Sequence, residues 1–178
     1  MSDSLVRDAT AADAEACAAI YAPYVTGTTI TFETDPPDAA EMTRRIAKAQ
    51  ARHAFLVLEQ DGEVLGYAYA GPFKERAAYR WSCEVSVYLA QDRRGRGGGR
   101  RLYEELLEQL TARGYRMAAA GMTQPNEASA RLHAALGFEP VGTYRAIGWK
   151  LGAPRDVTWV QRPLGGDPTP GVEPPDPT

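Results

Sequence analysis

Residues 81–110 read WSCEVSVYLAQDRRGRGGGRRLYEELLEQL, and this stretch decides how the whole chain is interpreted. Apolar residues occupy every second position of 81–89, which predicts a β-strand, and leucines recur every fourth position from Leu102, which predicts a helix. Between them lies RRGRGGGR, residues 93–100, which is too short and too tightly flanked to be a linker. Glycines let backbone N–H groups converge, and a helix N-terminus near Gly97 favours an anion. The stretch predicts a phosphate-binding loop, with a solvated arginine surface as the alternative.

The composition is that of an ordinary globular domain. The 178 residues are 44% hydrophobic and 24% charged, with a formal net charge of −3. Any basic patch is therefore local, which argues against general nucleic-acid binding. Cys17 and Cys83 have no partners at metal-ligand spacing, so we expect two reduced thiols and no metal. The sequence has no signal-like N-terminus and no apolar run that would span a bilayer, so we expect a cytoplasmic protein that binds neither nucleic acid nor membrane.

Patterns on both sides of this stretch predict the rest of the domain. Asp38 with Glu41 resembles a helix cap, and Asp61-Gly62 between two apolar runs predicts a β-hairpin. The expected order is β-α-α-β-β-β-α-β-α-β-β. That order predicts one α/β domain over residues 1–164, with a mixed, mainly antiparallel twisted sheet flanked by helices. Residues 165–178 are rich in proline and glycine, and we expect this tail to be disordered.

Arg94-x-x-Gly97-x-Gly99 matches the Q/R-x-x-G-x-G/A motif with which the GNAT acetyltransferase superfamily holds the pyrophosphate of acetyl-CoA. The segments YAGPFKERAAYRW, residues 69–81, and PNEASARLHAALGF, residues 125–138, resemble the phosphinothricin N-acetyltransferase group within it. The resemblance implies a GNAT-like fold, acetyl-CoA as co-substrate, no metal, and a homodimer. It also implies acetylation of the α-amino group of a small amino acid analogue such as phosphinothricin, methionine sulfoximine or methionine sulfone.

Two alternatives to this function remain open at this stage. The chain could acetylate a different small amine or a protein N-terminus, or it could be a non-catalytic acyl-CoA sensor on the same fold. A sensor would be expected to lack the catalytic base, and Glu84 is present. Lys74 and Arg76 would repel polycationic acceptors, which argues against polyamines.

Glu84 shares one face of the predicted strand with Ser82, Ser86 and Tyr88, in reach of the loop that would hold the co-substrate. Acetyl transfer to an amine needs a base, because the substrate arrives as an ammonium ion. Glu84 is therefore the candidate general base, and a wet sheet face is the alternative. The resemblance implies that it acts through water.

The resemblance assigns further roles. His133 would protonate the departing thiolate or contact the substrate, although a buried structural histidine is the more common use of such a residue. The predicted co-substrate contacts are Val87, Tyr88, Leu89, Arg94, Gly95, Arg96, Gly97, Gly98, Gly99, Arg100 and Asn126. The predicted acceptor contacts are Phe32, Lys74, Arg76, Tyr79, Tyr88 and Thr123.

The chain also departs from the pattern of this group. Gly98 stands where the motif usually has an aliphatic residue, so we expect a looser loop. Phe73 stands where the group has tryptophan, so the acceptor is not necessarily phosphinothricin.

Overall fold

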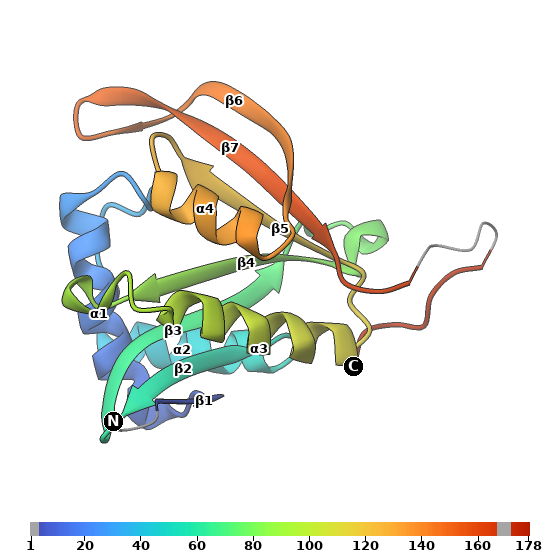
Figure 1. The fold of residues 1–178 in the computed structure, drawn as a ribbon, viewed down its shortest axis with the longest axis horizontal. Helices are drawn as coiled ribbons and strands as arrows, with labels where there is room; N and C mark the ends of the chain where they lie inside the picture. Colours follow the sequence, from blue (N-terminus) through green and yellow to red (C-terminus); the bar gives the residue numbers. More distant parts are fainter. Residues whose placement is uncertain (1–3, 167–171) are drawn as a thin grey trace.

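The computed structural model of the chain describes residues 4–166 and 172–178 (Figure 1). Within these residues it has seven strands and four α-helices, in the predicted order, which confirms the expected fold class. The strands are β1 (Leu5–Asp8), β2 (Phe55–Gln60), β3 (Glu63–Pro72), β4 (Ser82–Leu89), β5 (Met117–Thr123), β6 (Glu139–Lys150) and β7 (Ala153–Pro163). The helices are α1 (Ala14–Gly27), α2 (Ala39–Gln50), α3 (Gly98–Ala112) and α4 (Glu127–Ala135). None of the described helices is both long enough and apolar enough to cross a membrane.

The strands form one sheet in the order β1-β2-β3-β4-β5-β7-β6. All neighbouring strands run antiparallel except β4 and β5, which are parallel. β4 and β5 pair only between residues 82–84 and 117–119, and beyond that point they diverge, as Figure 1 shows. Residues 85–89 of β4 therefore keep an edge that no strand covers, although the other edge is paired with β3.

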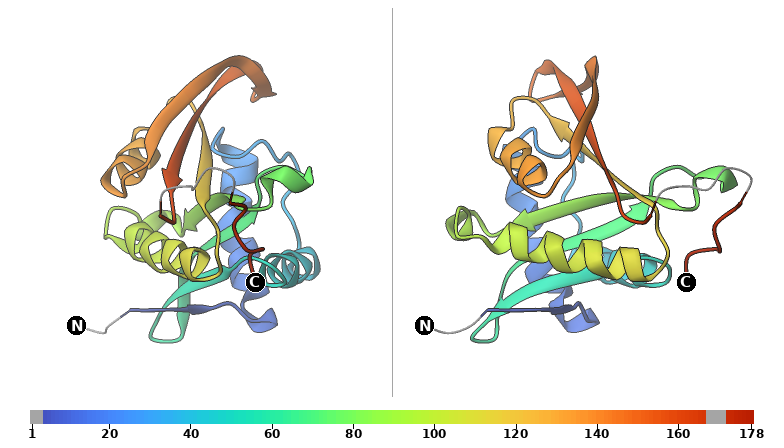
Figure 2. Two further views of the ribbon diagram at one scale, coloured as in Figure 1. Left: turned by 90° about the vertical axis from the view of Figure 1, so that its right-hand side faces the viewer. Right: turned by 45° about the vertical axis from the view of Figure 1, so that its right-hand side comes forward.

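Helices cover both faces of the sheet (Figure 2). On one face, Leu102, Leu106 and Leu110 of α3 pack against the core side chains of β2 to β5. On the other face, α1 and α2 pack against Tyr67 of β3 and its neighbours. The predicted alternation of β4 is confirmed, because Cys83 and Val85 lie in the α3-side core, whereas Tyr88 packs on the α1 side. Glu84 therefore faces the α1 and α2 side.

Local geometry confirms two turn predictions. Asp61 and Gly62 both have positive φ, 53° and 82°, as a type I′ hairpin turn between β2 and β3 requires. The Asp38 carboxylate accepts a hydrogen bond from the backbone N–H of Glu41 at 2.7 Å and thereby caps α2.

The predicted C-terminal disorder falls in part on residues 167–171, which lie outside the described residues. Residues 172–178 lie against the domain, where Glu173 and Asp176 form ion pairs with Arg80 at 2.6 and 2.5 Å. The sequence did not anticipate these contacts, because exposed acidic side chains in a proline-rich segment carry no pattern that indicates a partner.

Candidate active site

The glycine-arginine loop ends in an uncapped helix N-terminus. Gly95 and Gly97 have φ of 74° and 83°, in the left-handed region that glycine adopts without steric cost. Gly97 is the N-cap of α3 and provides no side-chain cap, so the first N–H groups of the helix have no partner within it. These donors, together with the helix dipole, form an anion site. This geometry allows phosphate binding, and the role of the loop stays a prediction.

The loop packs tightly at Gly98, contrary to our expectation of looseness. Gly98 and Gly99 are buried, and a Cβ added to Gly98 would lie 2.7 Å from Cδ2 of Leu58. The volume of the usual aliphatic side chain is thus occupied by a leucine of β2. A Cβ at Gly99 would approach Leu132 of α4 at 3.4 Å, so α3 and α4 also lie close together here.

Arg94, the first residue of the motif, is held from within the domain. Its Nε donates to the hydroxyl of Tyr24 at 3.1 Å, and its guanidinium lies 4.7 Å from the centre of that ring. The same hydroxyl donates to the Leu89 carbonyl at 2.6 Å, which fixes the end of β4. Arg100 is paired with Glu104, whereas Arg96 is exposed.

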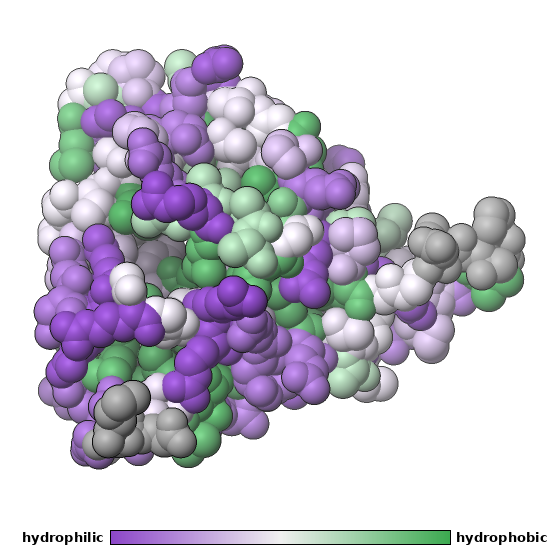
Figure 3. Space-filling model, in the orientation of Figure 1, coloured by the Kyte–Doolittle hydropathy of each residue, from purple (hydrophilic) through white to green (hydrophobic). Residues whose placement is uncertain are grey.

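The diverging strands expose the predicted co-substrate edge of β4. The side chains of Val87 and Leu89 pack on the α3-side core, so their backbone groups, and not their side chains, face the opening toward β5. Asn126 lies at the start of α4 across this opening, and its Oδ1 caps the helix by accepting from Ser129 N at 3.2 Å. Figure 3 shows a hollow on this face with hydrophilic side chains above and below it.

His133 lies in the core and not at the opening. It is 3% exposed, and its ring makes edge contacts with Tyr103 and Phe138 at 5.3 and 4.9 Å. Nδ1 lies 2.8 Å from the Ser129 carbonyl, which assigns the proton of the neutral ring to Nδ1, and the buried Nε2 has no partner among the described residues. Burial lowers the pKa of His133 and so disfavours the cation that could donate from Nε2. These contacts favour the structural alternative for this residue.

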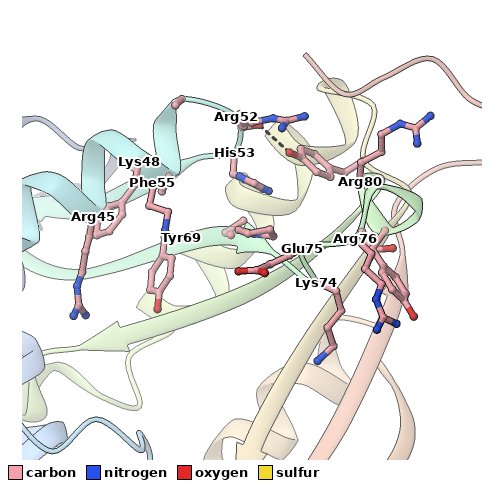
Figure 4. Close-up of a pocket in the computed structure, with 18 of the residues that line it drawn as sticks. Arg45, Lys48, Arg52, His53, Phe55, Tyr69, Lys74, Glu75, Arg76 and Arg80 are labelled. Carbon is pink, nitrogen blue, oxygen red and sulfur yellow. Dashed lines mark hydrogen bonds between the residues drawn. The ribbon is translucent and has the colours of Figure 1, made fainter.

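A cavity of about 860 Å³ lies beside β4, between α2, β3 and the loop of residues 73–81 (Figure 4). The structure brings three of the predicted acceptor residues, Lys74, Arg76 and Tyr79, together on its wall. In Figure 4 the side chains of Lys74 and Arg76 point downward, as the side chain of Arg45 does. Cations and hydroxyl groups therefore line a concave surface that suits an anionic ligand.

Three other predicted acceptor residues do not line this cavity. Phe32 is exposed, and its ring lies on β6, where a Cβ added to Gly148 would come within 2.3 Å of it. Thr123 is buried at the end of β5. Tyr88 packs edge-on against Tyr21 of α1, with ring centres 4.8 Å apart. Side-chain neighbours of this kind depend on the path of loops and on strand order, which a local motif does not specify.

Glu84 lies on the cavity side of the sheet, opposite Gly71 of β3. It does not itself line the cavity, but Gly71 and Ser82, its neighbours on that face, do. Burial raises the pKa of Glu84, and the positive charge of Lys74 opposes that rise. A desolvated carboxylate with a raised pKa is a stronger proton acceptor than an exposed one, as general-base chemistry requires.

The structure adds residues that the sequence did not single out. The carboxylate of Glu33 takes two hydrogen bonds from Arg45 at 2.8 and 3.0 Å and one from the Tyr21 hydroxyl at 3.0 Å. The ammonium of Lys150, at the end of β6, donates to the carbonyls of Thr31 and Glu33 at 2.7 and 2.8 Å. Arg45 lines the cavity, so this network fixes one of its walls. The partners are far apart in sequence, and no local pattern would indicate them.

The described residues hold no cluster of three His, Cys, Asp or Glu side chains that could bind a metal ion. Both cysteines are buried, and burial raises the pKa of each thiol to about 12. They therefore stay protonated at neutral pH and are poor nucleophiles. The chemistry that the site can support is the binding of a phosphate-bearing ligand beside an anion-binding cavity, with a carboxylate between them.

Comparison with known proteins identifies relatives along most of the chain. A family model described as an acetyltransferase (GNAT) domain matches residues 6–159. The phosphinothricin N-acetyltransferase of Streptomyces viridochromogenes is 41% identical over 157 residues, which cover 88% of this chain and 86% of the relative. The L-methionine sulfoximine/L-methionine sulfone acetyltransferase of Pseudomonas paraeruginosa is 37% identical over 167 residues, 92% of this chain and 95% of the relative.

A solved structure is similar over the same length. The crystal structure of a GNAT superfamily phosphinothricin acetyltransferase from Sinorhizobium meliloti, in complex with AcCoA, matches with a TM-score of 0.88 and 39% identity. The match covers 95% of each chain.

Proposed function

Because this chain belongs to the GNAT acetyltransferase family, and is therefore an acetyl-CoA-dependent enzyme, we propose that it acetylates the α-amino group of a small amino acid analogue. The observation that carries this proposal is the cavity on the Glu84 side of β4, where Lys74 and Arg76 lie together without an acidic ion-pair partner among the described residues. Two fixed cations suit an acceptor with a carboxylate and a second anionic or strongly polar group. Relatives named for phosphinothricin and for methionine sulfoximine and sulfone support this class.

We propose that acetyl-CoA lies across the opening between β4 and β5. The uncapped start of α3 suits its pyrophosphate, and the uncovered edge of residues 85–89 can hydrogen-bond its extended arm as a neighbouring strand would. Asn126, at the N-cap of α4, is the proposed side-chain contact for the same arm. When bound, acetyl-CoA would supply an activated acyl group, and a backbone N–H near Val87 would polarise the thioester oxygen.

In the proposed reaction, Glu84 takes a proton from the acceptor ammonium through a water molecule. The resulting amine attacks the acetyl carbon, a C–N bond forms and the C–S bond breaks, and the second proton lost from the nitrogen passes to the departing sulfur, so that the products are the N-acetyl compound and the thiol of CoA. Lys74 and Arg76 hold the acceptor so that amine and thioester are in line, and this proximity supplies much of the rate. No covalent intermediate with the enzyme is needed, in keeping with the protonated state of both cysteines.

We also propose that the chain forms a homodimer through β6. This strand exposes an apolar group of side chains, Val141, Tyr144, Ile147 and Trp149, of which Trp149 is 72% exposed. Apolar residues gathered on one strand of a monomer commonly mark a protein interface. A second copy of the chain would cover them.

The test is thiol release from acetyl-CoA with phosphinothricin, methionine sulfoximine, methionine sulfone, common amino acids and a polyamine as acceptors. Glu84→Gln should lower kcat on accepted substrates by about 10²–10⁴-fold, the range of general-base catalysis, while acetyl-CoA still binds. Glu108→Gln, on the exposed side of α3, is the matched control and should keep wild-type activity. Full activity of Glu84→Gln would refute the base. Binding of acetyl-CoA without turnover of any acceptor would favour a sensor.

A further inference from the structure

The cavity extends well beyond the space that a single amino acid analogue fills. It reaches from Tyr69, which pairs with Ser86 in the register of β3 and β4, past Gly71 to Ser82. At about 3.3 Å per residue, the four residues from Ser86 to Ser82 span ~13 Å. Across β3 from β4 the cavity also reaches His53, which follows α2 and directly precedes Ala54, whose carbonyl accepts a hydrogen bond from Ala70 of β3. Cavities of this volume accept drug-sized ligands, which are much larger than methionine sulfone.

His53 presents an unpartnered polar group to this far end. The side chain is 7% exposed, and its ring stacks on Tyr115 with ring centres 4.9 Å apart. Neither ring nitrogen has a hydrogen-bond partner among the described residues. Figure 4 shows the ring turned into the same space as the side chains of Tyr69 and Glu75. Unlike Nε2 of His133, these nitrogens are not fully buried, so a ligand that enters the cavity can reach them and complete their hydrogen bonding.

The protonation state of His53 defines what it can bind. Burial lowers its pKa to about 4, and the charges of Arg52 and Arg113 act in the same direction. The ring is therefore neutral at neutral pH and offers one N–H donor. Lys48 and Arg52 also line the cavity and have no acidic partner among the described residues, whereas Glu75 is its acidic lining residue. The far end as a whole favours an anion that accepts hydrogen bonds.

We propose that the His53 end of the cavity is a distal acceptor subsite, which binds the carboxylate of an acceptor as long as a dipeptide with a free N-terminus. The proposal rests on the proposed function, because it assumes that the amine is acetylated beside Glu84. A dipeptide spans the cavity with its amine near Glu84 and its carboxylate near His53. Figure 4 shows the carboxylate of Glu75 turned toward the middle of the cavity, where it can accept the peptide N–H.

The experiment compares two acceptors with the same N-terminal residue, methionine sulfone and the dipeptide methionine sulfone-glycine. His53→Phe keeps a ring on Tyr115 but removes the donor, and His53→Gln restores a donor. We expect His53→Phe to lower kcat/KM for the dipeptide about ten-fold, as loss of a hydrogen bond to a charged group does, with less than about two-fold change for methionine sulfone. His53→Gln should recover part of the loss for the dipeptide alone.

A second measurement does not depend on variants. The chain has 2 histidines, so the imidazole region of its NMR spectrum holds signals from only two rings. The dipeptide should shift the signals of His53 in the wild-type enzyme, and methionine sulfone should not. Turnover of methionine sulfone without dipeptide turnover, or equal effects of His53→Phe on both acceptors, would overturn the subsite and leave the proposed function intact. Turnover of neither acceptor, nor of phosphinothricin or methionine sulfoximine, would overturn both.

Discussion

Replacement of Lys150 by methionine should weaken the wall of the cavity that is built from the segment between α1 and α2. The ammonium of Lys150 is buried, with 7% of the residue exposed, and donates to the carbonyls of Thr31 and Glu33 at 2.7 and 2.8 Å. Methionine retains the apolar stem of the side chain but leaves both carbonyls without this donor. Because the Glu33 carboxylate holds Arg45 in the cavity wall, we expect the change to affect the proposed acceptor site as well.

The expected loss follows from the two unpaired carbonyls. A buried polar group that loses its partner costs ~1–3 kcal/mol, and part of the cost is recovered if water enters, so we expect about 2–4 kcal/mol in the free energy of unfolding. For a domain of this size each kcal/mol shifts Tm by ~2–4 °C, so Tm should fall by roughly 4–16 °C. KM for the acceptor should rise, whereas KM for acetyl-CoA should not.

Thermal and urea denaturation measure the first effect, and thiol release at varied acceptor concentration measures the second. Arg131→Met, on the exposed side of α4, is the control and should lie within about 0.5 kcal/mol of wild type. An unfolding free energy of Lys150→Met equally close to wild type would show that the two hydrogen bonds contribute nothing net, and the reasoning would fail.

Three further changes test other parts of the structure. The Asp13 carboxylate accepts two hydrogen bonds from Arg7, which lower its pKa from 3.8 to about 2. The ionised carboxylate therefore contributes about 2 kcal/mol to the free energy of unfolding above pH 3.8, and this contribution is lost as the pH falls toward 2. Urea titrations at several pH values should show this loss in the wild type but not in Asp13→Asn. Tyr24→Phe removes the partner of Arg94 and the donor to the Leu89 carbonyl, so KM for acetyl-CoA should rise several-fold at unchanged kcat, and the rise should be smaller for S-acetylcysteamine, which lacks pyrophosphate. Gly98→Val forces a side chain into occupied core space and should cost ~1–3 kcal/mol in chemical denaturation; a stabilised variant would contradict the packing described for this loop.

The parts of the fold that could be predicted are those encoded by neighbouring residues. The type I′ turn at Asp61-Gly62 needs only two residues, and the cap at Asp38 needs a carboxylate three positions before a free N–H. The alternation that places Glu84 and Val85 on opposite faces of the sheet is likewise a property of one strand. Each of these is settled by chemistry within a few positions, so one sequence suffices to infer it.

The parts that could not be predicted depend on contacts between distant segments. His53 stands alone before β2, and only the packing of α2 against the sheet brings it to the cavity. Lys150 reads as an ordinary polar residue at a strand end, yet it is buried against a loop more than 100 residues away in sequence. The motif predicts that Phe32 lines the pocket, but its ring packs against β6 at Gly148, where no side chain is in the way.

The position of Glu84 ties the two halves of the site together. It forms the last pair between β4 and β5, with Ala119, and from the next residue onward the two strands separate. Over residues 82–84 the backbone of β4 pairs with β5, whereas over residues 85–89 the same edge of β4 is open to an extended ligand. Because the side chain of Glu84 points to the cavity face, it lies where a ligand in the opening and a ligand in the cavity come closest. A carboxylate at residue 82, on the same face, would lie farther from the opening, and one at residue 83 or 85 would face the α3-side core, so the divergence of the sheet and the alternation of the strand together favour residue 84 as the place for the proposed base.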